Sequence, residues 1–315
     1  MLEAKYQDFY DQIIHKIPKE KIFTDKLHTL AYGTDASFYR LIPKIVIKTD
    51  NAKEVQDIIK LSNSMNLSIT FRAGGTSLSG QAISDSILII TSRNFSNFKI
   101  ASDISYISLE PALTGAQVNG LLARYSKKIG PDPASINAAM IGGIAANNAS
   151  GMCCGISQNS YKTLKSMKLI FSDGTKLDTS CEKSKDSFRK THDEFLKDLK
   201  SFSEETKTNE ELRAKIERKY KIKNTCGYSL NSLIDFDDEF EILEHLIIGS
   251  EGTLAFIEEI TYYTVEDLKD KASTLIYFKD IKEACSAVTK LKLAKEAKTI
   301  NVEAVELMDR AGLAS

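Results

Sequence analysis

Residues 44–90, KIVIKTDNAKEVQDIIKLSNSMNLSITFRAGGTSLSGQAISDSILII, contain the pattern that decides the fold. Two apolar runs of strand type, residues 44–48 and 67–71, flank a segment in which Asn51 and Glu54 form a helix-capping pair and apolar residues recur at helical spacing. Strand, helix and strand in this order predict a right-handed βαβ unit, whose ligand edge lies at the carboxyl ends of its strands. The segment after the second strand is therefore the first candidate for a ligand site.

A glycine-rich loop, RAGGTSLSGQ at residues 72–81, follows that second strand. Small residues allow backbone N–H groups to converge on an anion, and glycine lets the backbone approach a phosphate without an intervening Cβ atom. The loop matches neither the Rossmann fingerprint nor the Walker motif. It predicts a pyrophosphate site, and the alternative is a flexible surface turn.

Residues 130–155, GPDPASINAAMIGGIAANNASGMCCG, form the least ordinary stretch of the chain. Small and amide side chains dominate it, and it has almost no charge with which to face solvent. This composition favours a backbone that lies against a large flat ligand, with Asn147, Asn148 and Ser150 as hydrogen-bonding groups. The alternative is a tightly packed buried crossing.

Composition excludes several classes of protein. The chain has 315 residues, enough for one large or two ordinary domains, and its net charge of −1 supplies no general attraction for nucleic acid. Its apolar runs are all shorter than the ~18 residues of a membrane span. Five cysteines without a CxxC motif and four scattered histidines fit neither a disulfide framework nor a metal-ligand set. We therefore expect an intracellular chain with a local binding site, no metal and no nucleic-acid partner.

The second half of the chain changes character several times. Residues 181–223 are highly charged and predict a solvated helical insertion. A compact polar motif at residues 223–230 follows, and then a glycine-rich turn at residues 249–252 beside an apolar strand. Residues 272–278 and 300–307 read as strands on either side of an amphipathic helix, which predicts the opening of a second α+β domain.

Six segments in collinear order resemble the FAD-linked D-2-hydroxyacid dehydrogenases of the vanillyl-alcohol-oxidase, or PCMH, type. The likeness is strongest to the long bacterial D-lactate dehydrogenases that fuse an FAD domain to an iron–sulfur domain. The segments are YGTDASFYRLIPKIVIK, FRAGGTSLSGQ, GPDPASINAAMIGGIAANNASGMCCG, KIKNTCGYSLNSLIDF, GSEGTLAFIEEIT and AVELMDRAGL.

The resemblance implies an α+β fold in which a PCMH-type FAD-binding domain of two α+β subdomains is followed by the start of an α+β substrate, or cap, domain. We expect an N-terminal helical arm at residues 1–38, the FAD-binding domain at residues 39–266 with a charged helical insertion at about 181–223, and the beginning of a truncated cap domain at residues 267–315.

The resemblance also assigns cofactor residues, position by position. FAD is expected in an elongated cleft between the two subdomains, with its pyrophosphate on the glycine-rich loop. Arg72 is either an ion-paired anchor or a direct contact. Some relatives attach the flavin through a histidine in this loop, and this loop has none, so the resemblance implies non-covalent FAD. The expected cofactor residues are Arg72, Ala73, Gly74, Gly75, Thr76, Ser77, Gly80, Gln81, Pro131, Asp132, Pro133, Ser135, Gly142, Gly143, Asn147, Asn148, Ser150, Gly151, Glu251, Gly252 and Thr253.

The implied reaction is hydride transfer from C2 of a D-2-hydroxyacid to the flavin, which gives the 2-oxoacid. In the family, the base, the substrate-binding cation and any metal or iron–sulfur cluster belong to the part after the cap domain begins. We therefore expect the catalytic residues beyond Ser315, and a chain that is inactive or weakly active by itself. The alternatives are a flavin-binding subunit that needs a partner chain and an inactive remnant.

The resemblance leaves the partners of the full-length protein partly open. The substrate is expected to be a small 2-hydroxyacid, and the electron acceptor is a quinone, a cytochrome or an iron–sulfur protein. The expected location is cytoplasmic, with peripheral docking on the inner face of the membrane as an option for the full-length protein.

Overall fold

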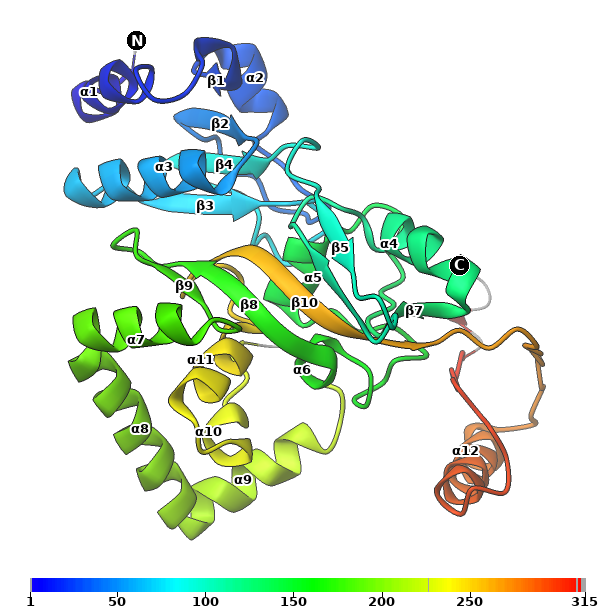
Figure 1. Cartoon of the computed structure of the whole chain (residues 1–315). Coiled ribbons are helices and arrows are strands. Elements are labelled where there is room, and N and C mark those ends of the chain that lie inside the picture. Colours follow the sequence, from blue (N-terminus) through cyan, green and yellow to red (C-terminus); the bar gives the residue numbers. More distant parts are fainter. Residues whose placement is uncertain (1, 226, 310, 313–315) are drawn as a thin grey trace.

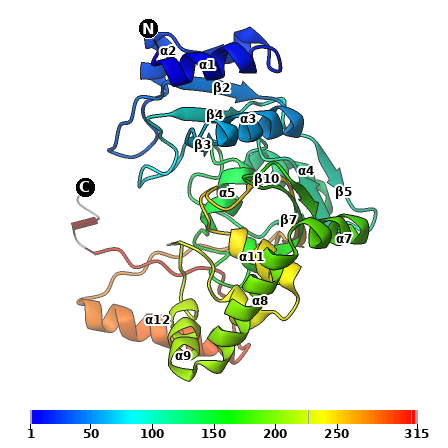
Figure 2. The same ribbon diagram turned by 90° about the vertical axis from the view of Figure 1, so that its left-hand side faces the viewer.

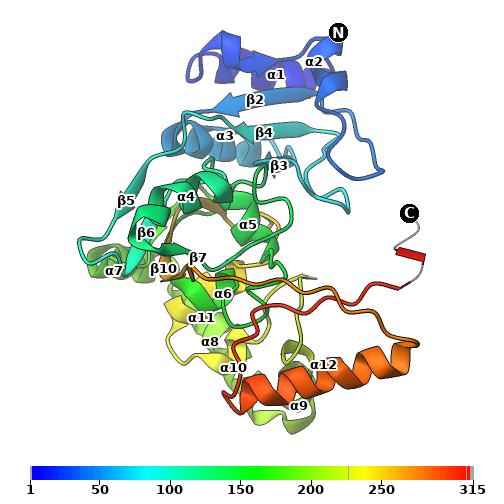
Figure 3. The same cartoon turned by 90° about the vertical axis from the view of Figure 1, so that its right-hand side faces the viewer.

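The computed structural model describes residues 2–225, 227–309 and 311–312. A four-stranded sheet at one end and a six-stranded sheet in the middle, with helices around both, give the expected α+β fold (Figure 1). A helical layer covers the far side of the second sheet, and the C-terminal segment runs away from both sheets (Figures 1 and 3).

The predicted βαβ unit is present in the first sheet. Its two strands, β2 and β3, lie on either side of β4 and run parallel to it, so the loop after β3 leaves from the carboxyl edge of the sheet. The Asn51 side chain accepts a hydrogen bond from the Glu54 N–H at 3.0 Å, as the capping pattern predicts. The Glu54 carboxylate does not complete the reciprocal cap, because it accepts from the Asp50 N–H instead. The elements are β2 (Ile45–Thr49), α3 (Ala52–Ser64), β3 (Ile69–Arg72) and β4 (Ile87–Thr91).

Residues 2–38 pack on this sheet and extend it. Phe9 and Ile13 are fully buried in the same apolar core as Ile47 and Ile58 of the βαβ unit. A short strand, β1, pairs antiparallel with β2, so this segment is more than a helical arm. Figure 2 shows its helices on the outer side of the sheet. The elements are α1 (Ala4–Ile13), η1 (Lys19–Lys21), β1 (Ile22–Phe23) and α2 (Lys26–Ala31).

The second sheet is organised around one long strand, β10. It pairs antiparallel with β6 on one side and with β8 on the other, and its last residues pair with β7. β10 therefore joins segments that are about 100 and 150 residues earlier in the chain. The strands are β5 (Phe98–Ile100), β6 (Tyr106–Leu109), β7 (Lys127–Ile129), β8 (Leu164–Ile170), β9 (Lys176–Asp178) and β10 (Phe256–Glu266).

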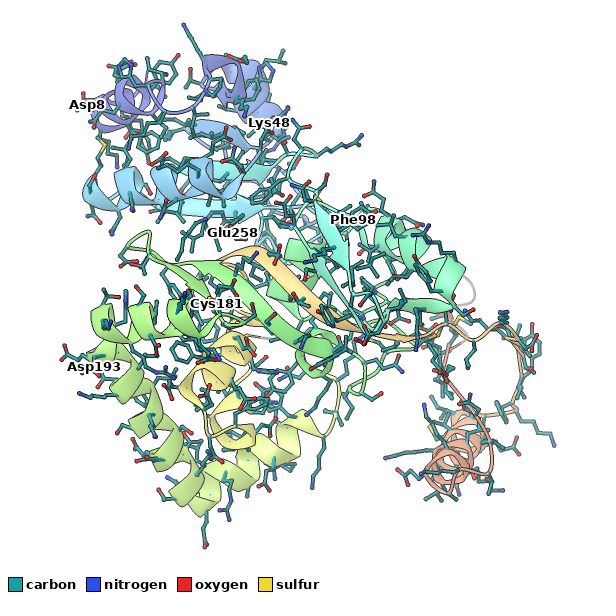
Figure 4. All side chains as sticks on the ribbon, viewed as in Figure 1. Asp8, Lys48, Phe98, Cys181, Asp193 and Glu258 are labelled. Atoms are coloured by element: carbon teal, nitrogen blue, oxygen red, sulfur yellow. The ribbon has the colours of Figure 1, made fainter. Side chains whose placement is uncertain are left out.

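Helices from several parts of the chain cover the second sheet. The charged stretch at residues 181–223 forms three of them, and the apolar side chains that they bury are Phe188, Leu196, Leu199 and Ile216. Cys181 and Asp193 mark the starts of the first two (Figure 4). The helices are α4 (Gly115–Leu122), η2 (Ala123–Tyr125), α5 (Ile141–Asn147), α6 (Ser160–Thr163), α7 (Glu182–Thr191), α8 (Asp193–Thr208), α9 (Glu210–Tyr220), α10 (Ser232–Asp235) and α11 (Glu239–Ile247).

An apolar seam holds the two sheets against each other. Phe256 at the start of β10 contacts Phe71 of β3, with ring centroids 5.0 Å apart, and also Phe95 at 6.0 Å. Val55 and Ile59 of α3 are buried in the same cluster. Because the seam lies directly beside the carboxyl end of β3, it places the glycine-rich loop next to the second sheet.

The segment after β10 is only partly as expected. The predicted amphipathic helix is present as α12 (Ile281–Glu296), but residues 272–278 and 300–307 form no strands. The strand prediction is wrong here because a strand needs a neighbour for its N–H and C=O groups, and none of the described strands lies beside these residues. Leu275, Ile276 and Tyr277 are more than half exposed as a result.

Candidate functional site

The glycine-rich loop turns back on itself at the carboxyl end of β3. Gly75 and Gly80 adopt positive φ angles of 65° and 78°, which glycine tolerates without strain. The Gly75 carbonyl accepts a hydrogen bond from the Ala36 N–H at 3.1 Å, so the N-terminal segment supports the loop from behind. A Cβ atom on Gly74 would lie 2.4 Å from the Ala138 carbonyl oxygen, so this loop meets the segment at residues 130–151 directly.

Arg72 is the charged residue at the base of the loop. Its Nε donates to the Ala82 carbonyl oxygen at 2.7 Å, and its Nη2 donates to the Tyr32 carbonyl oxygen at 3.1 Å. Burial lowers the pKa of its guanidinium group, while the neighbouring Asp35 acts in the opposite direction. Two backbone carbonyls thus anchor the guanidinium group in place of the expected ion pair, and a direct phosphate contact stays a prediction.

The segment at residues 130–151 supplies the opposite wall. A Cβ atom on Gly151 would lie 1.7 Å from the Asp132 carbonyl oxygen, so the two ends of the segment pack against each other. A Cβ atom on Gly143, in contrast, would meet only the Ala73 side chain, at 3.5 Å. The segment is closely packed at Gly151, as in a buried crossing, and faces a cleft at Gly143, where a flat ligand stays the prediction.

These two walls and the turn before β10 enclose a cleft of about 630 Å³. This volume is within the range of about 300–1,000 Å³ that is usual for ligand pockets. The predicted cofactor residues that line it are Arg72, Ala73, Gly74, Gly75, Thr76, Ser77, Gln81, Pro133, Ser135, Gly142, Gly143, Asn147, Ser150, Glu251 and Gly252.

The other predicted residues lie behind or beside this lining. The Asp132 carboxylate accepts hydrogen bonds from the N–H groups of Cys153 and Cys154, both at 3.1 Å, so it organises the wall from within. Asn148 is buried and accepts from the Tyr161 N–H at 3.4 Å. The predicted residues outside the lining are Gly80, Pro131, Asp132, Asn148, Gly151 and Thr253.

Glu251 connects all three segments of the cleft. Its N–H donates to the Ala146 carbonyl oxygen at 2.8 Å, and its Oε1 accepts from Asn147 Nδ2 at 2.5 Å and from Gln81 Nε2 at 3.4 Å. Gln81 Oε1 in turn accepts from the hydroxyl of Ser77. Burial raises the pKa of the Glu251 carboxyl group, and the two amide donors partly offset this effect.

The structure adds residues to the cleft that were not predicted for it. Lys223, Thr225 and Gly227 line it from the segment that follows α9. The available signal was the compact polar motif at residues 223–230, directly after a long charged stretch. Met140 also lines the cleft, although its apolar side chain suggested no such role.

The described part of the chain holds neither a metal-ligand cluster nor a membrane-spanning helix. No group of three or more histidine, cysteine, aspartate or glutamate side chains there could hold a metal ion. Among the same residues, no helix combines the length and the hydropathy that a membrane crossing requires.

Comparison with known proteins identifies the domain. Residues 43–180 match the family model described as "FAD binding domain". The chain is 25% identical over 266 residues to D-2-hydroxyglutarate dehydrogenase of Haemophilus influenzae, covering 82% of this chain and 26% of that protein. It is 23% identical over 252 residues to D-lactate dehydrogenase of Archaeoglobus fulgidus, covering 78% of this chain and 44% of that protein. The chain thus spans less than half the length of these relatives.

A solved structure supports the fold independently. Alkyldihydroxyacetonephosphate synthase superposes with a TM-score of 0.61 at 15% identity, over 92% of this chain and 47% of that one. At this identity the likeness concerns the fold alone. Residues 43–180 therefore form an FAD-binding domain with FAD as its cofactor, and the chain is similar to D-2-hydroxyglutarate and D-lactate dehydrogenases.

Proposed function

We propose that the chain is the FAD-binding part of an oxidoreductase of the D-lactate dehydrogenase type, which oxidises a D-2-hydroxyacid to the 2-oxoacid. The observation that carries the proposal is the cleft, in which three small-residue segments from distant parts of the chain face one another. The similarity to D-2-hydroxyglutarate and D-lactate dehydrogenases supports the substrate class. The domain limits at residues 39–266 and 267–315 belong to the same proposal.

The residues of the cleft fit a long, flat, anionic cofactor. Gly74, Gly75 and Ser77 line the cleft at the carboxyl edge of a parallel sheet, where the backbone N–H groups of small residues suit a pyrophosphate. Gly143 leaves the opposite wall flat at that point, and Pro133 adds an uncharged surface. We assign a non-covalent FAD to this position. When bound, the flavin supplies the hydride acceptor, and the protein supplies orientation and electrostatics.

Cofactor binding is the role that we assign to this chain's own residues. Among the described residues that line the cleft, the charged ones are Arg72, Lys223 and Glu251. Carbonyl groups hold the guanidinium of Arg72, and amide groups hold the carboxyl group of Glu251. We therefore propose no catalytic base within these residues and expect little or no turnover by the chain alone.

A flavin-binding subunit that acts with a partner chain is the second candidate. Three consecutive exposed apolar side chains, Leu275, Ile276 and Tyr277, favour it, because exposed apolar patches often mark a site of protein contact. Co-expression with a candidate partner, followed by an activity assay, would separate this candidate from the first.

Cofactor titration tests the main proposal. We expect FAD to bind and to raise the unfolding free energy by about 2.7 kcal/mol at a hundredfold excess over Kd. FMN, which lacks the pyrophosphate and adenosine, should bind far more weakly if the loop holds the pyrophosphate. Equal binding of FAD and FMN would contradict the assignment of the loop, and the lack of any flavin signal would contradict the cofactor site.

Substrate assays test the reaction class. Flavin bleaching or dye reduction with D-lactate or D-2-hydroxyglutarate, and not with L-lactate, is the expected selectivity for the complete enzyme. Fast turnover by the 315-residue chain alone would contradict our placement of the catalytic groups outside it.

A further inference from the structure

We propose that Glu251 is a positioning residue for the cofactor, that its carboxyl group joins the glycine-rich loop to α5, and that it takes up one proton when FAD binds. The inference deepens the proposed function and rests on the FAD cleft described above.

The position of Glu251 is set by its backbone. The residue has a φ angle of 54°, in the left-handed region that non-glycine residues seldom adopt, and it stands in the turn between α11 and β10. Its N–H donates to the Ala146 carbonyl oxygen, and the Gly249 N–H donates to the Ala145 carbonyl oxygen at 3.1 Å. The turn is thus fastened to the C-terminal end of α5, and the carboxyl group has little freedom to leave the cleft.

The carboxyl group then bridges two segments that no strand pairing connects. Asn147 belongs to α5 in the second subdomain, and Gln81 ends the glycine-rich loop of the first. Both amides donate to the same oxygen, Oε1, which must therefore act as an acceptor. A proton on the carboxyl group would consequently be carried by Oε2.

The electrostatic surroundings of Glu251 favour the protonated form. The loop contributes uncharged residues from Ala73 to Gln81, and α5 contributes none with a charge. Arg72 faces carbonyl oxygens, Lys223 lines the cleft from the segment after α9, and the Tyr228 hydroxyl lies 2.9 Å from Thr253 Oγ1. Burial already raises the pKa of this carboxyl group.

Bound FAD would raise the pKa of the Glu251 carboxyl group further, through two effects. Its pyrophosphate brings negative charge into a cleft that already holds a carboxylate, and its bulk excludes water from that carboxylate. Both raise the pKa of Glu251 in the bound state above that of the free protein. By linkage, FAD affinity is highest below the pKa of the free state and falls as pH rises toward the pKa of the bound state.

Two measurements on the full chain test the inference. We expect the Kd for FAD to rise as pH increases from below the pKa of Glu251 in the free chain toward its pKa in the bound state, by up to a factor of about ten per pH unit. Calorimetry in two buffers with different ionisation enthalpies should show uptake of about one proton per FAD. Glu251→Gln keeps the acceptor oxygen but cannot titrate, so it should bind FAD with a pH-independent Kd close to the low-pH value of the natural chain.

Two further variants serve as controls. Glu204→Gln makes the same change at an exposed position on α8 and should retain the pH dependence. Glu251→Ala removes the bridge and should weaken FAD binding at every pH. FAD binding by the natural chain without pH dependence, or an unchanged pH dependence in Glu251→Gln, would overturn the inference and leave the FAD cleft intact. Failure of the natural chain to bind FAD would overturn both.

Discussion

Gly75 and Gly151, one on each wall of the cleft, serve opposite purposes. On the loop wall, residues 72–81, Gly75 has a positive φ angle, and a Cβ atom there would come no closer than 3.5 Å to the Arg72 side chain. On the second wall, residues 130–151, a Cβ atom on Gly151 would collide with the Asp132 carbonyl oxygen at 1.7 Å. The comparison separates glycines that leave room for a ligand from glycines that allow the protein to pack against itself.

The strongest test of this comparison is Gly151→Ala. The added methyl group has no space beside Asp132, so we expect a loss of about 3 kcal/mol or more in the free energy of unfolding, and loss of FAD binding as a consequence. Chemical denaturation measures the first effect. Gly120→Ala is the matched control, since a Cβ atom on Gly120 has no neighbour within 4 Å. Equal stability of the two variants would show that this wall is not held by close packing.

The second test is Gly75→Val on the loop wall. The side chain would stand where the backbone meets the phosphate, and a β-branched residue is strained at this φ angle by about 1–3 kcal/mol. We expect FAD binding to be abolished while the chain remains folded. Gly155→Val places the same side chain at a φ angle of 50° outside the cleft lining, and it should keep FAD affinity. If Gly75→Val bound FAD with unchanged affinity, the loop would be only a surface turn and not a phosphate site.

Arg72→Lys addresses what holds the loop wall in place. Lysine keeps the positive charge but cannot reproduce both hydrogen bonds to the Ala82 and Tyr32 carbonyl oxygens. We expect the unfolding free energy to fall by about 1–3 kcal/mol, and FAD affinity to decrease only modestly. A large loss of affinity with full stability would instead identify Arg72 as a direct phosphate contact.

The smallest effect on stability is expected for Gly143→Ala. The methyl group would make an ordinary contact with Ala73, and alanine is favoured over glycine in a helix by up to about 1 kcal/mol. The unfolding free energy should therefore stay the same or rise slightly, whereas FAD affinity should fall because the cleft becomes narrower. A large fall in the unfolding free energy of Gly143→Ala would instead show that Gly143, like Gly151, is needed for close packing.

Much of the fold followed from local pattern. The apolar runs and the Asn51 cap predicted β2, α3 and β3, since strand and helix periodicity are encoded over a few residues. The strands expected at residues 272–278 and 300–307 did not form, because a strand depends on a neighbour that local sequence does not reveal. The same limit explains why residues 1–38 read as a helical arm, although β1 joins the first sheet.

The sequence alone predicted an FAD-binding chain and the three segments that line the cleft, because each is a short run of small residues with its own recognisable order. Only the tertiary structure decided what each residue does within them. It turned Arg72 toward carbonyl groups, brought Lys223 into the cleft lining and placed Glu251 between Gln81 and Asn147. Gln81 and Glu251 are 170 positions apart, and their contact depends on how two sheets pack along one apolar seam. No local pattern contains that information.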